Sequence, residues 1–235
     1  MPMIDMRKET PIVLSVGGSL IVPDGGPDWR FLKKFHATIL ELARHGKRCV
    51  LVSGGGKTAR HYIEAAKKIT EISREDLDWL GIHATRLNAH LLRTIFRSVA
   101  HPVVVKDPTH LPETWESQVL IAGGWKPGWS TDYVAARLGE VVGATTIINL
   151  SNIDYVYDAD PRTVKGAEPF TELSWEAYRK MVGETWDPGL SAPFDPIASK
   201  FCEEKKMSVV ILNGKKMRNL KRALSGKKFK GTLIA

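Results

Sequence analysis

Two clusters of glycine stand where the sequence passes from an apolar run to a helical pattern: Gly17-Gly18-Ser19 and Gly54-Gly55-Gly56. A backbone without Cβ atoms lets a ligand approach closely, and the first turn of a helix offers free N–H groups to an anion. A third turn of this kind, residues 123–131, also lies between a strand pattern and a helix pattern. Three such turns indicate a ligand with several phosphates, or two ligands that meet. The alternative is that the glycines only form tight turns.

Two familiar phosphate-binding motifs fit the second cluster poorly. A P-loop ending at Gly56-Lys57-Thr58 would need a glycine at position 51, where the chain has Leu51, so that motif is excluded. Gly54-x-Gly56-x-x-Ala59 matches the loose dinucleotide fingerprint, which also expects an acidic residue at the end of a strand about 20 residues on. That region has a helical pattern, so a dehydrogenase is the weaker alternative.

Arg60 follows Gly56 by four residues, so it lies on the same helix face, one turn below the expected anion site. Its guanidinium can bind a phosphate with two hydrogen bonds, although an ion pair with Glu64 would also explain it. The sequence has no Ser-His-Asp order and no His-Glu-x-x-His motif, and its seven histidines are scattered singly. This pattern favours phosphoryl transfer, which depends on positioning and charge rather than on covalent work by the protein.

Short apolar runs alternate with helical periods along the chain, which predicts an α/β fold around a mainly parallel sheet. One compact unit is expected, with no internal repeat. Strands are predicted at 12–16, 48–53, 103–105, 119–122, 146–150, 208–212 and 231–234. Helices are predicted at 28–44, 57–68, 73–99, 131–142, 195–205 and 216–225, with a hairpin or turn at 152–161. Small and polar residues in the long helix (Thr85, Asn88, Ala89) indicate close packing, for example against another subunit.

The composition is that of a globular protein, with 43% hydrophobic and 26% charged residues, which excludes a disordered tail, a fibre and a coiled coil. No apolar stretch reaches the roughly 20 residues that cross a bilayer, so no membrane partner is expected. Residues 1–10 lack an apolar signal core, and Cys49 and Cys202 show no metal-ligand spacing. We therefore expect a cytoplasmic protein with two reduced, buried cysteines.

The net charge of +8 is concentrated at one end of the chain. From Lys200 onward, 11 lysines and arginines face only Glu203 and Glu204. No aromatic residues alternate with these cations, so we do not expect nucleic acid as a partner. A solvated basic face, or one that meets an anionic ligand, is the expectation.

Taken together, the motifs resemble the amino acid kinase family, and within it the archaeal-type uridylate (UMP) kinases. The resemblance spans nearly the whole chain. Its blocks are Val16-Gly-Gly-Ser19, Ser53-Gly-Gly-Gly-Lys-Thr-Ala-Arg60, Asp78 to Ala89, Gly123-Gly-Trp-Lys-Pro-Gly-Trp-Ser-Thr-Asp132, Asn152 to Pro161, Phe194-Asp-Pro-Ile-Ala198 and Gly231-Thr232.

The resemblance implies a three-layer α/β/α sandwich with a mainly parallel sheet, formed by a single domain over residues 1–235. An acceptor lobe would cover about 1–150 and an ATP lobe about 151–235. It implies transfer of the γ-phosphate of ATP to UMP, giving UDP for pyrimidine nucleotide biosynthesis, by a homohexamer that assembles through the long helical region. Mg²⁺ would accompany ATP, with no dedicated set of protein metal ligands.

The resemblance also assigns roles to matching residues. Arg60 and Asp132 would be catalytic, Asp132 by orienting groups or helping to place Mg²⁺. ATP would contact Gly18, Ser19, Gly56, Arg60, Ser151, Asn152, Tyr157 and Asp160. UMP would contact Gly55, Asp78, Trp125, Lys126, Pro127, Gly128, Trp129, Ser130 and Thr131.

Three positions depart from the family pattern. Ser15 stands where many amino acid kinases have a lysine, which leaves Lys57 and Lys126 as candidates for a cation at the transferred phosphate. Tyr155 replaces a glycine. Trp125 and Trp129 stand where relatives have small or polar residues, and they could stack on a base, fill the pocket or pack between subunits. This loop keeps two alternatives open: a kinase for another small acceptor, and a non-catalytic nucleotide-binding or storage protein.

Overall fold

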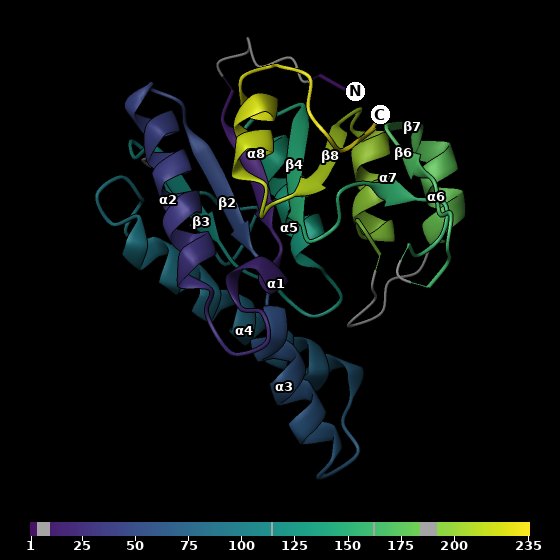
Figure 1. Ribbon diagram of the computed structural model, residues 1–235. Coiled ribbons are helices and arrows are strands. Elements are labelled where there is room, and N and C mark those ends of the chain that lie inside the picture. Colours follow the sequence, from purple (N-terminus) through teal and green to yellow (C-terminus); the bar gives the residue numbers. More distant parts are fainter. Residues whose placement is uncertain (4–9, 114, 162, 184–191) are drawn as a thin grey trace.

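A computed structural model describes residues 1–3, 10–113, 115–161, 163–183 and 192–235. Its centre is a seven-stranded sheet (Figure 1). The strand order is β3 (Val119–Ala122), β2 (Cys49–Ser53), β1 (Ile12–Val16), β4 (Thr146–Ser151), β8 (Ser208–Asn213), β9 (Thr232–Ile234) and β7 (Glu172–Leu173). The first five strands run parallel, whereas β9 is antiparallel to β8. The carboxyl ends of the parallel strands therefore meet along one edge, where the connecting turns lie.

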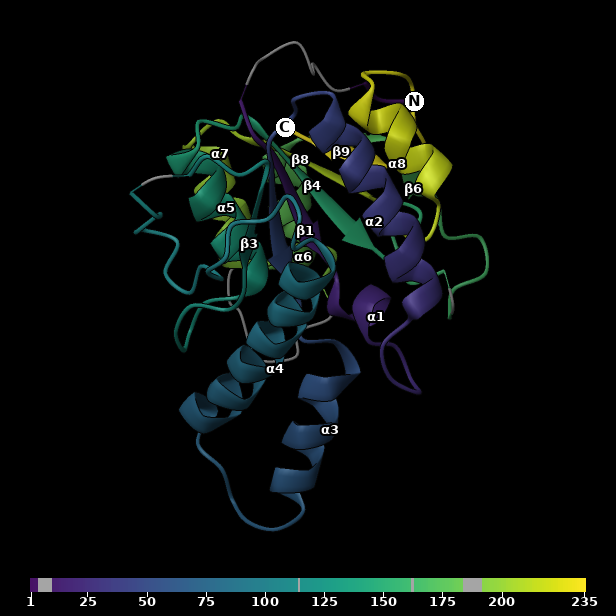
Figure 2. The same cartoon turned by 90° about the vertical axis from the view of Figure 1, so that its left-hand side faces the viewer.

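Helices cover both faces of the sheet. The core on one face joins α1 (Gly18–Ile21), α2 (Trp29–Arg44) and α8 (Met217–Leu224). The core on the opposite face joins α5 (Thr131–Val141), α6 (Trp175–Val182) and α7 (Pro196–Glu204). Figure 2 shows the two helical layers on either side of the sheet. This confirms the expected three-layer α/β/α sandwich.

Helices α3 (Gly56–Lys67) and α4 (Arg74–Ile95) form a pair that extends beyond the sheet (Figure 2). The second half of α4 enters the core through Ala89 and Leu92, and Phe96 follows just beyond its end. In contrast, α3 has no fully buried residue. Only one end of this pair is therefore fixed by the core of the chain.

The structure changes three local expectations. The strand expected at 103–105 is wrong: only Val105 makes an isolated bridge, to Ala122, because the segment lies outside the edge strand β3 and leaves Val103 61% exposed. The segment 152–161 contributes β5 (Val156–Tyr157), which pairs antiparallel with β6 (Pro169–Phe170) as a hairpin. Helix α6 was not anticipated.

The expected helix cap and the two buried cysteines are confirmed. Asp195 caps α7 by accepting a hydrogen bond from the Ala198 N–H, with Pro196 in the first helical position. Cys49 and Cys202 are buried and unpaired. Across the described ranges, no helix combines the length and apolar character needed to span a membrane.

Candidate active site

The turns after β1 and β2 pack backbone against backbone. A Cβ atom added to Gly18 would lie 2.0 Å from the Gly56 nitrogen, and one added to Gly54 would lie 2.5 Å from the Gly18 nitrogen. Gly56 also has a φ of +64°, a conformation that favours glycine. The glycines are therefore needed for contact between the two turns, whether or not a ligand is present.

Helices α1 and α3 begin at these turns without a side-chain cap, with Gly17 and Gly55 in the N-cap positions. By contrast, α4 and α5 begin at Ser73 and Ser130, whose hydroxyls accept hydrogen bonds from the first turn. An uncapped helix start leaves backbone N–H groups for an anion. The paired turns therefore form the best candidate in the described chain for a phosphate site.

The cations near this site are placed differently from one another. Arg60 is exposed on α3 and makes no ion pair with Glu64 among the described residues. The alternative role for Arg60, a surface ion pair with Glu64, is therefore not observed. Lys57 Nζ pairs with Asp24 at 2.9 Å. Of the two cations near the start of α3, Arg60 is thus the one that forms no ion pair in the described chain and is available to a ligand.

The third turn, residues 123–130, is held by side chains of α4. The Thr85 hydroxyl accepts a hydrogen bond of 2.6 Å from the Gly124 N–H. Arg86 donates from Nε to the Gly124 carbonyl at 3.1 Å and from Nη2 to the Trp125 carbonyl at 2.7 Å. No role was predicted for Arg86, because its partners lie 38 and 39 residues away along the chain.

Two more polar residues of α4 contact the glycine turns. Asp78 Oδ2 accepts a hydrogen bond of 2.7 Å from the Gly128 N–H. Asn88 donates from Nδ2 to the carbonyls of Gly54 and Gly55 at 2.8 and 3.1 Å. The close packing expected for Asn88 is therefore present, and it is made with turns of the same chain. Helix α4 fixes the second and third turns relative to each other.

The aromatic residues of the third turn contact one another. The Trp125 and Trp129 ring centroids lie 6.0 Å apart, and the Trp129 ring contacts the tilted ring of Tyr133 of α5, with 4.0 Å between centroids. Tyr133 in turn meets the edge of Phe201 at 5.4 Å. Lys126 Nζ lies 4.1 Å from the centroid of the Trp125 ring. The rings form a row along the loop, anchored to the layer of α5 and α7.

Asp132, in the first turn of α5, lies at the meeting point of β1 and α7. Its Oδ1 accepts a hydrogen bond of 3.1 Å from the Ser15 hydroxyl, and its Oδ2 accepts one of 3.2 Å from the Asp195 N–H. Burial, and next the neighbouring Asp195 carboxylate, raise the pKa of Asp132 from 3.8 to about 7. Ser15, at the position where many relatives have a lysine, thus faces this carboxylate.

The described residues contain no group of three or more histidines, cysteines, aspartates or glutamates that could hold a metal. Asp132 is a hard oxygen donor near the glycine turns, which fits Mg²⁺ that is held mainly by phosphate oxygens and water. Asp195 is committed to capping α7 and is 4% exposed.

The residues expected at the ATP nucleoside follow β4. Ser151 ends that strand beside Asn213 of β8, and the Leu150 carbonyl accepts a hydrogen bond from the Gly17 N–H at 2.9 Å. This places the expected nucleoside residues next to the first glycine turn. Asp160 lies farther along, after the first strand of the β5–β6 hairpin. Tyr155 has no left-handed backbone conformation, so the tyrosine fits where relatives have glycine.

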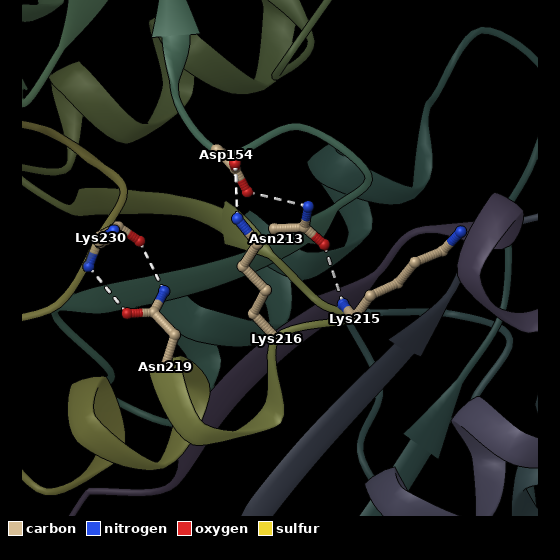
Figure 3. A network of polar contacts seen from close by, with 6 residues as sticks. All are labelled: Asp154, Asn213, Lys215, Lys216, Asn219 and Lys230. Atoms are coloured by element: carbon tan, nitrogen blue, oxygen red, sulfur yellow. Dashed lines mark hydrogen bonds and ion pairs between the residues drawn. The ribbon is translucent and has the colours of Figure 1, made fainter.

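A polar network that the sequence did not suggest supports this loop (Figure 3). Asp154 accepts hydrogen bonds from Asn213 Nδ2 at 3.0 Å and from Lys216 Nζ at 2.7 Å. Partial burial raises the pKa of the Asp154 carboxyl. The hydrogen bonds from Lys216 and Asn213 and the positive charges of Lys216 and Lys230 outweigh burial, so the pKa lies below its ordinary value. The network joins the loop after β4 to the loop after β8.

Comparisons with known proteins agree with this geometry. The model of the amino acid kinase family matches residues 10–213. The uridylate kinase of Hyperthermus butylicus is 35% identical over 225 residues, which cover 95% of this chain and 97% of that protein. The uridylate kinase of Thermococcus sibiricus is 36% identical, with 95% and 98% covered.

A solved structure shares the fold over the same extent. The crystal structure of uridylate kinase from Archaeoglobus fulgidus superimposes with a TM-score of 0.80 at 34% identity, covering 96% of this chain and all of that one. Similarity in sequence and in structure thus extends through both faces of the sheet and all three glycine turns. The chain belongs to the amino acid kinase family.

Proposed function

We propose that the chain is a uridylate kinase that transfers the γ-phosphate of ATP to UMP. The observation that carries the proposal is the pair of uncapped glycine turns beside a separately clamped third turn, in a chain similar over its length to proteins named uridylate kinase. A phosphate oxygen of UMP forms the new bond to the γ-phosphorus, and the bond from that phosphorus to the β-phosphate oxygen breaks. The products are UDP and ADP, and the reaction serves pyrimidine nucleotide synthesis.

The first two turns would bind the ATP phosphates. Gly18, Ser19 and Gly56 present backbone at the starts of α1 and α3, and Arg60 adds a cation on the same helix. Charge that develops on the transferred group is stabilised by such fixed donors. The nucleoside would lie against Ser151, Asn152, Tyr157 and Asp160.

The third turn would bind UMP. The contacts would come from Trp125, Lys126, Pro127, Gly128, Trp129, Ser130 and Thr131, together with Gly55 of the second turn. The hydrogen bond from the Gly128 N–H gives Asp78 the role of positioning this loop, in addition to any contact with the nucleotide. The row of rings offers stacking to a pyrimidine base.

Mg²⁺ bound with ATP would neutralise phosphate charge during transfer. Asp132 would orient groups around the transferred phosphate and help to place the ion. Its raised pKa makes the carboxylate available above about pH 7, and a nearby cation would extend that range downward.

We also propose that the chain has an acceptor lobe, about 1–150, and an ATP lobe, about 151–235. The protein would be cytoplasmic and would assemble as a homohexamer. Extension of α3 and α4 beyond the sheet supports assembly through this region (Figure 2). Tyr62 and Ile69 at its end are 64% and 83% exposed, although they are apolar or aromatic. Size measurement in solution would test the hexamer.

The reaction is tested by ADP release from Mg-ATP with UMP, CMP, dUMP, AMP, GMP or no acceptor. Selective release with UMP, together with UDP as the second product, is the expected result. Release with a different acceptor, or ATP binding without release, would contradict the proposal. The second outcome would leave a non-catalytic nucleotide-binding protein.

A further inference from the structure

A basic cavity of about 770 Å³ lies on the sheet face covered by α2 and α8. Its walls come from these two helices, from the loop between β8 and α8, from Met1 and from the strap (residues 226–231, between α8 and β9). Besides Lys216 and Arg222, five cationic side chains line it: Lys34, Lys215, Arg218, Lys228 and Lys230. The cavity gathers much of the positive charge that the sequence concentrates after Lys200.

These five side chains form no ion pair with a carboxylate in the part of the chain that is described. Nearby lysines do have such partners: Lys216 pairs with Asp154, and Lys221 pairs with Glu41. Positive charge that is not neutralised in a concave site raises the local concentration of anions. The cavity is therefore suited to a ligand with several negative charges.

The strap is fixed before any ligand arrives. Asn219 donates from Nδ2 to the Lys230 carbonyl at 2.6 Å and accepts from the Lys230 N–H at 2.8 Å, a pair of bonds visible in Figure 3. Arg222 donates from Nε to the Lys228 carbonyl at 2.8 Å. The backbone that carries Lys228 and Lys230 is thus already in place, which lowers the entropy cost of binding.

The cavity also has an apolar wall. Met1, Met217 and Phe229 contribute to its lining. The volume lies within the roughly 300–1,000 Å³ that is common for small-molecule sites. Cationic and apolar side chains in the same lining match a nucleotide with several phosphates.

This cavity is distinct from the proposed transfer site. Asp132 and Asp195 belong to helices α5 and α7 on the opposite face of the sheet. No residue assigned to ATP or UMP lines the cavity. Two contacts link the cavity to the loop after β4. The Gly214 N–H, next to Lys215 of the lining, donates to the Ser151 carbonyl at 2.9 Å, and Lys216 of the lining pairs with Asp154.

We infer that the cavity binds the polyphosphate of a second nucleoside triphosphate, outside the transfer site. The inference goes beyond the proposed kinase reaction and does not depend on which acceptor is used. Lys34, Lys215, Arg218, Lys228 and Lys230 contact the phosphates, and the apolar wall contacts the base.

Calorimetric titration with β,γ-imido-ATP in the presence of saturating UMP tests this inference. The expected stoichiometry is two analogues per chain, and inorganic tripolyphosphate should displace the one in the cavity. Lys228→Glu should weaken that second event at least tenfold. Lys227→Glu, the same charge change on the neighbouring strap residue outside the lining, should leave it within twofold. Thermal unfolding confirms that both variants are folded.

Binding of a single analogue by the wild-type chain would overturn the inference. Equal weakening by Lys227→Glu and Lys228→Glu would also overturn it, because a diffuse charged surface, such as one for nucleic acid, would then explain the binding. The proposed kinase reaction fails separately: a chain that binds two analogues but forms no UDP contradicts the reaction and leaves the cavity site standing.

Discussion

The first two glycine turns and the third turn lie along the same edge of the sheet, but they are held by different means. Gly18 and Gly56 are in backbone contact, with no room for a Cβ atom on either. The third turn is held at a distance by side chains of α4, through Thr85, Arg86 and Asp78.

This difference separates a fixed part of the site from an adaptable one. A backbone-to-backbone contact tolerates almost no side chain, so the geometry that the first two turns would offer to the ATP phosphates cannot vary without loss of the fold. Side-chain clamps can be exchanged one at a time, so the third turn, where we propose that the acceptor binds, can change its shape and its rings. The two tryptophans at 125 and 129 are placed in the adaptable part.

The largest effect is expected from Gly18→Ala. The added Cβ would lie 2.0 Å from the Gly56 nitrogen, so the two turns must separate. We expect the free energy of unfolding to fall by about 3 kcal/mol or more, the range of severe overpacking, with loss of activity. Thermal unfolding measures the loss of stability.

Gly81→Ala is the matched control, because a Cβ at Gly81 in α4 meets nothing within 4 Å. It should stabilise the helix by up to about 1 kcal/mol. A Gly18→Ala variant as stable as the wild type would show that the contact between the turns is not essential.

The next effect is expected from Arg60→Ala in the fixed part. Loss of one donor to the transferred group should lower kcat roughly 100-fold, while the unfolding temperature stays unchanged because Arg60 is exposed. Steady-state kinetics with UMP measures the change. Lys67→Ala, at the far end of the same helix, should have no effect, and a near-normal kcat for Arg60→Ala would remove Arg60 from the site.

A smaller, selective effect is expected from Asp78→Ala in the adaptable part. Without the carboxylate, the Gly128 N–H loses its partner and the loop loosens. The KM for UMP should rise about tenfold, equivalent to about 1.4 kcal/mol, with the KM for ATP unchanged.

Asp78→Asn separates positioning from charge, because its amide oxygen can still accept the Gly128 hydrogen bond. The KM for UMP should then stay within about threefold of the wild-type value. Equal increases in both KM values for Asp78→Ala would contradict a division of the site between the turns.

The smallest effect is expected from Asp132→Asn on stability. The folded-state pKa of about 7 exceeds the ordinary 3.8, so the folded chain holds a proton that the unfolded chain releases. The free energy of unfolding therefore falls as pH rises from about 4 to about 7. Because Asp132 is only half-buried, we expect the variant to gain about 1 kcal/mol at pH 8, roughly 2–4 °C in Tm.

The same comparison at pH 5 provides the control. At pH 5 the folded wild-type carboxyl is protonated and therefore uncharged, so burying it costs less and the advantage of Asp132→Asn should shrink. An advantage that is equal at the two pH values, or absent at pH 8, would mean that Asp132 does not titrate as its surroundings indicate.

The sequence predicted the sheet, most helices and the three turns because their signals are local. Apolar runs, caps such as Ser73 and Asp195, and glycine clusters depend on neighbouring residues only. The clamps were not predictable in this way, since Arg86 meets Gly124 38 residues along the chain and Ser15 meets Asp132 at a separation of 117.

The misplaced strand at 103–105 has a similar cause. Its valines have strand propensity, but propensity does not tell whether a partner strand is within reach, and only Val105 meets β3. The roles given to the site residues came from the family resemblance and stay predictions, whereas the contacts that position those residues came from the structure.

The most direct test of the division between fixed and adaptable turns is a crystal structure of the chain with UMP, Mg²⁺ and β,γ-imido-ATP. The account predicts triphosphate oxygens at the backbone of Gly18 and Gly56 and at Arg60, with UMP against residues 125–131. A triphosphate bound away from the first two turns, or UMP bound away from the third, would contradict it.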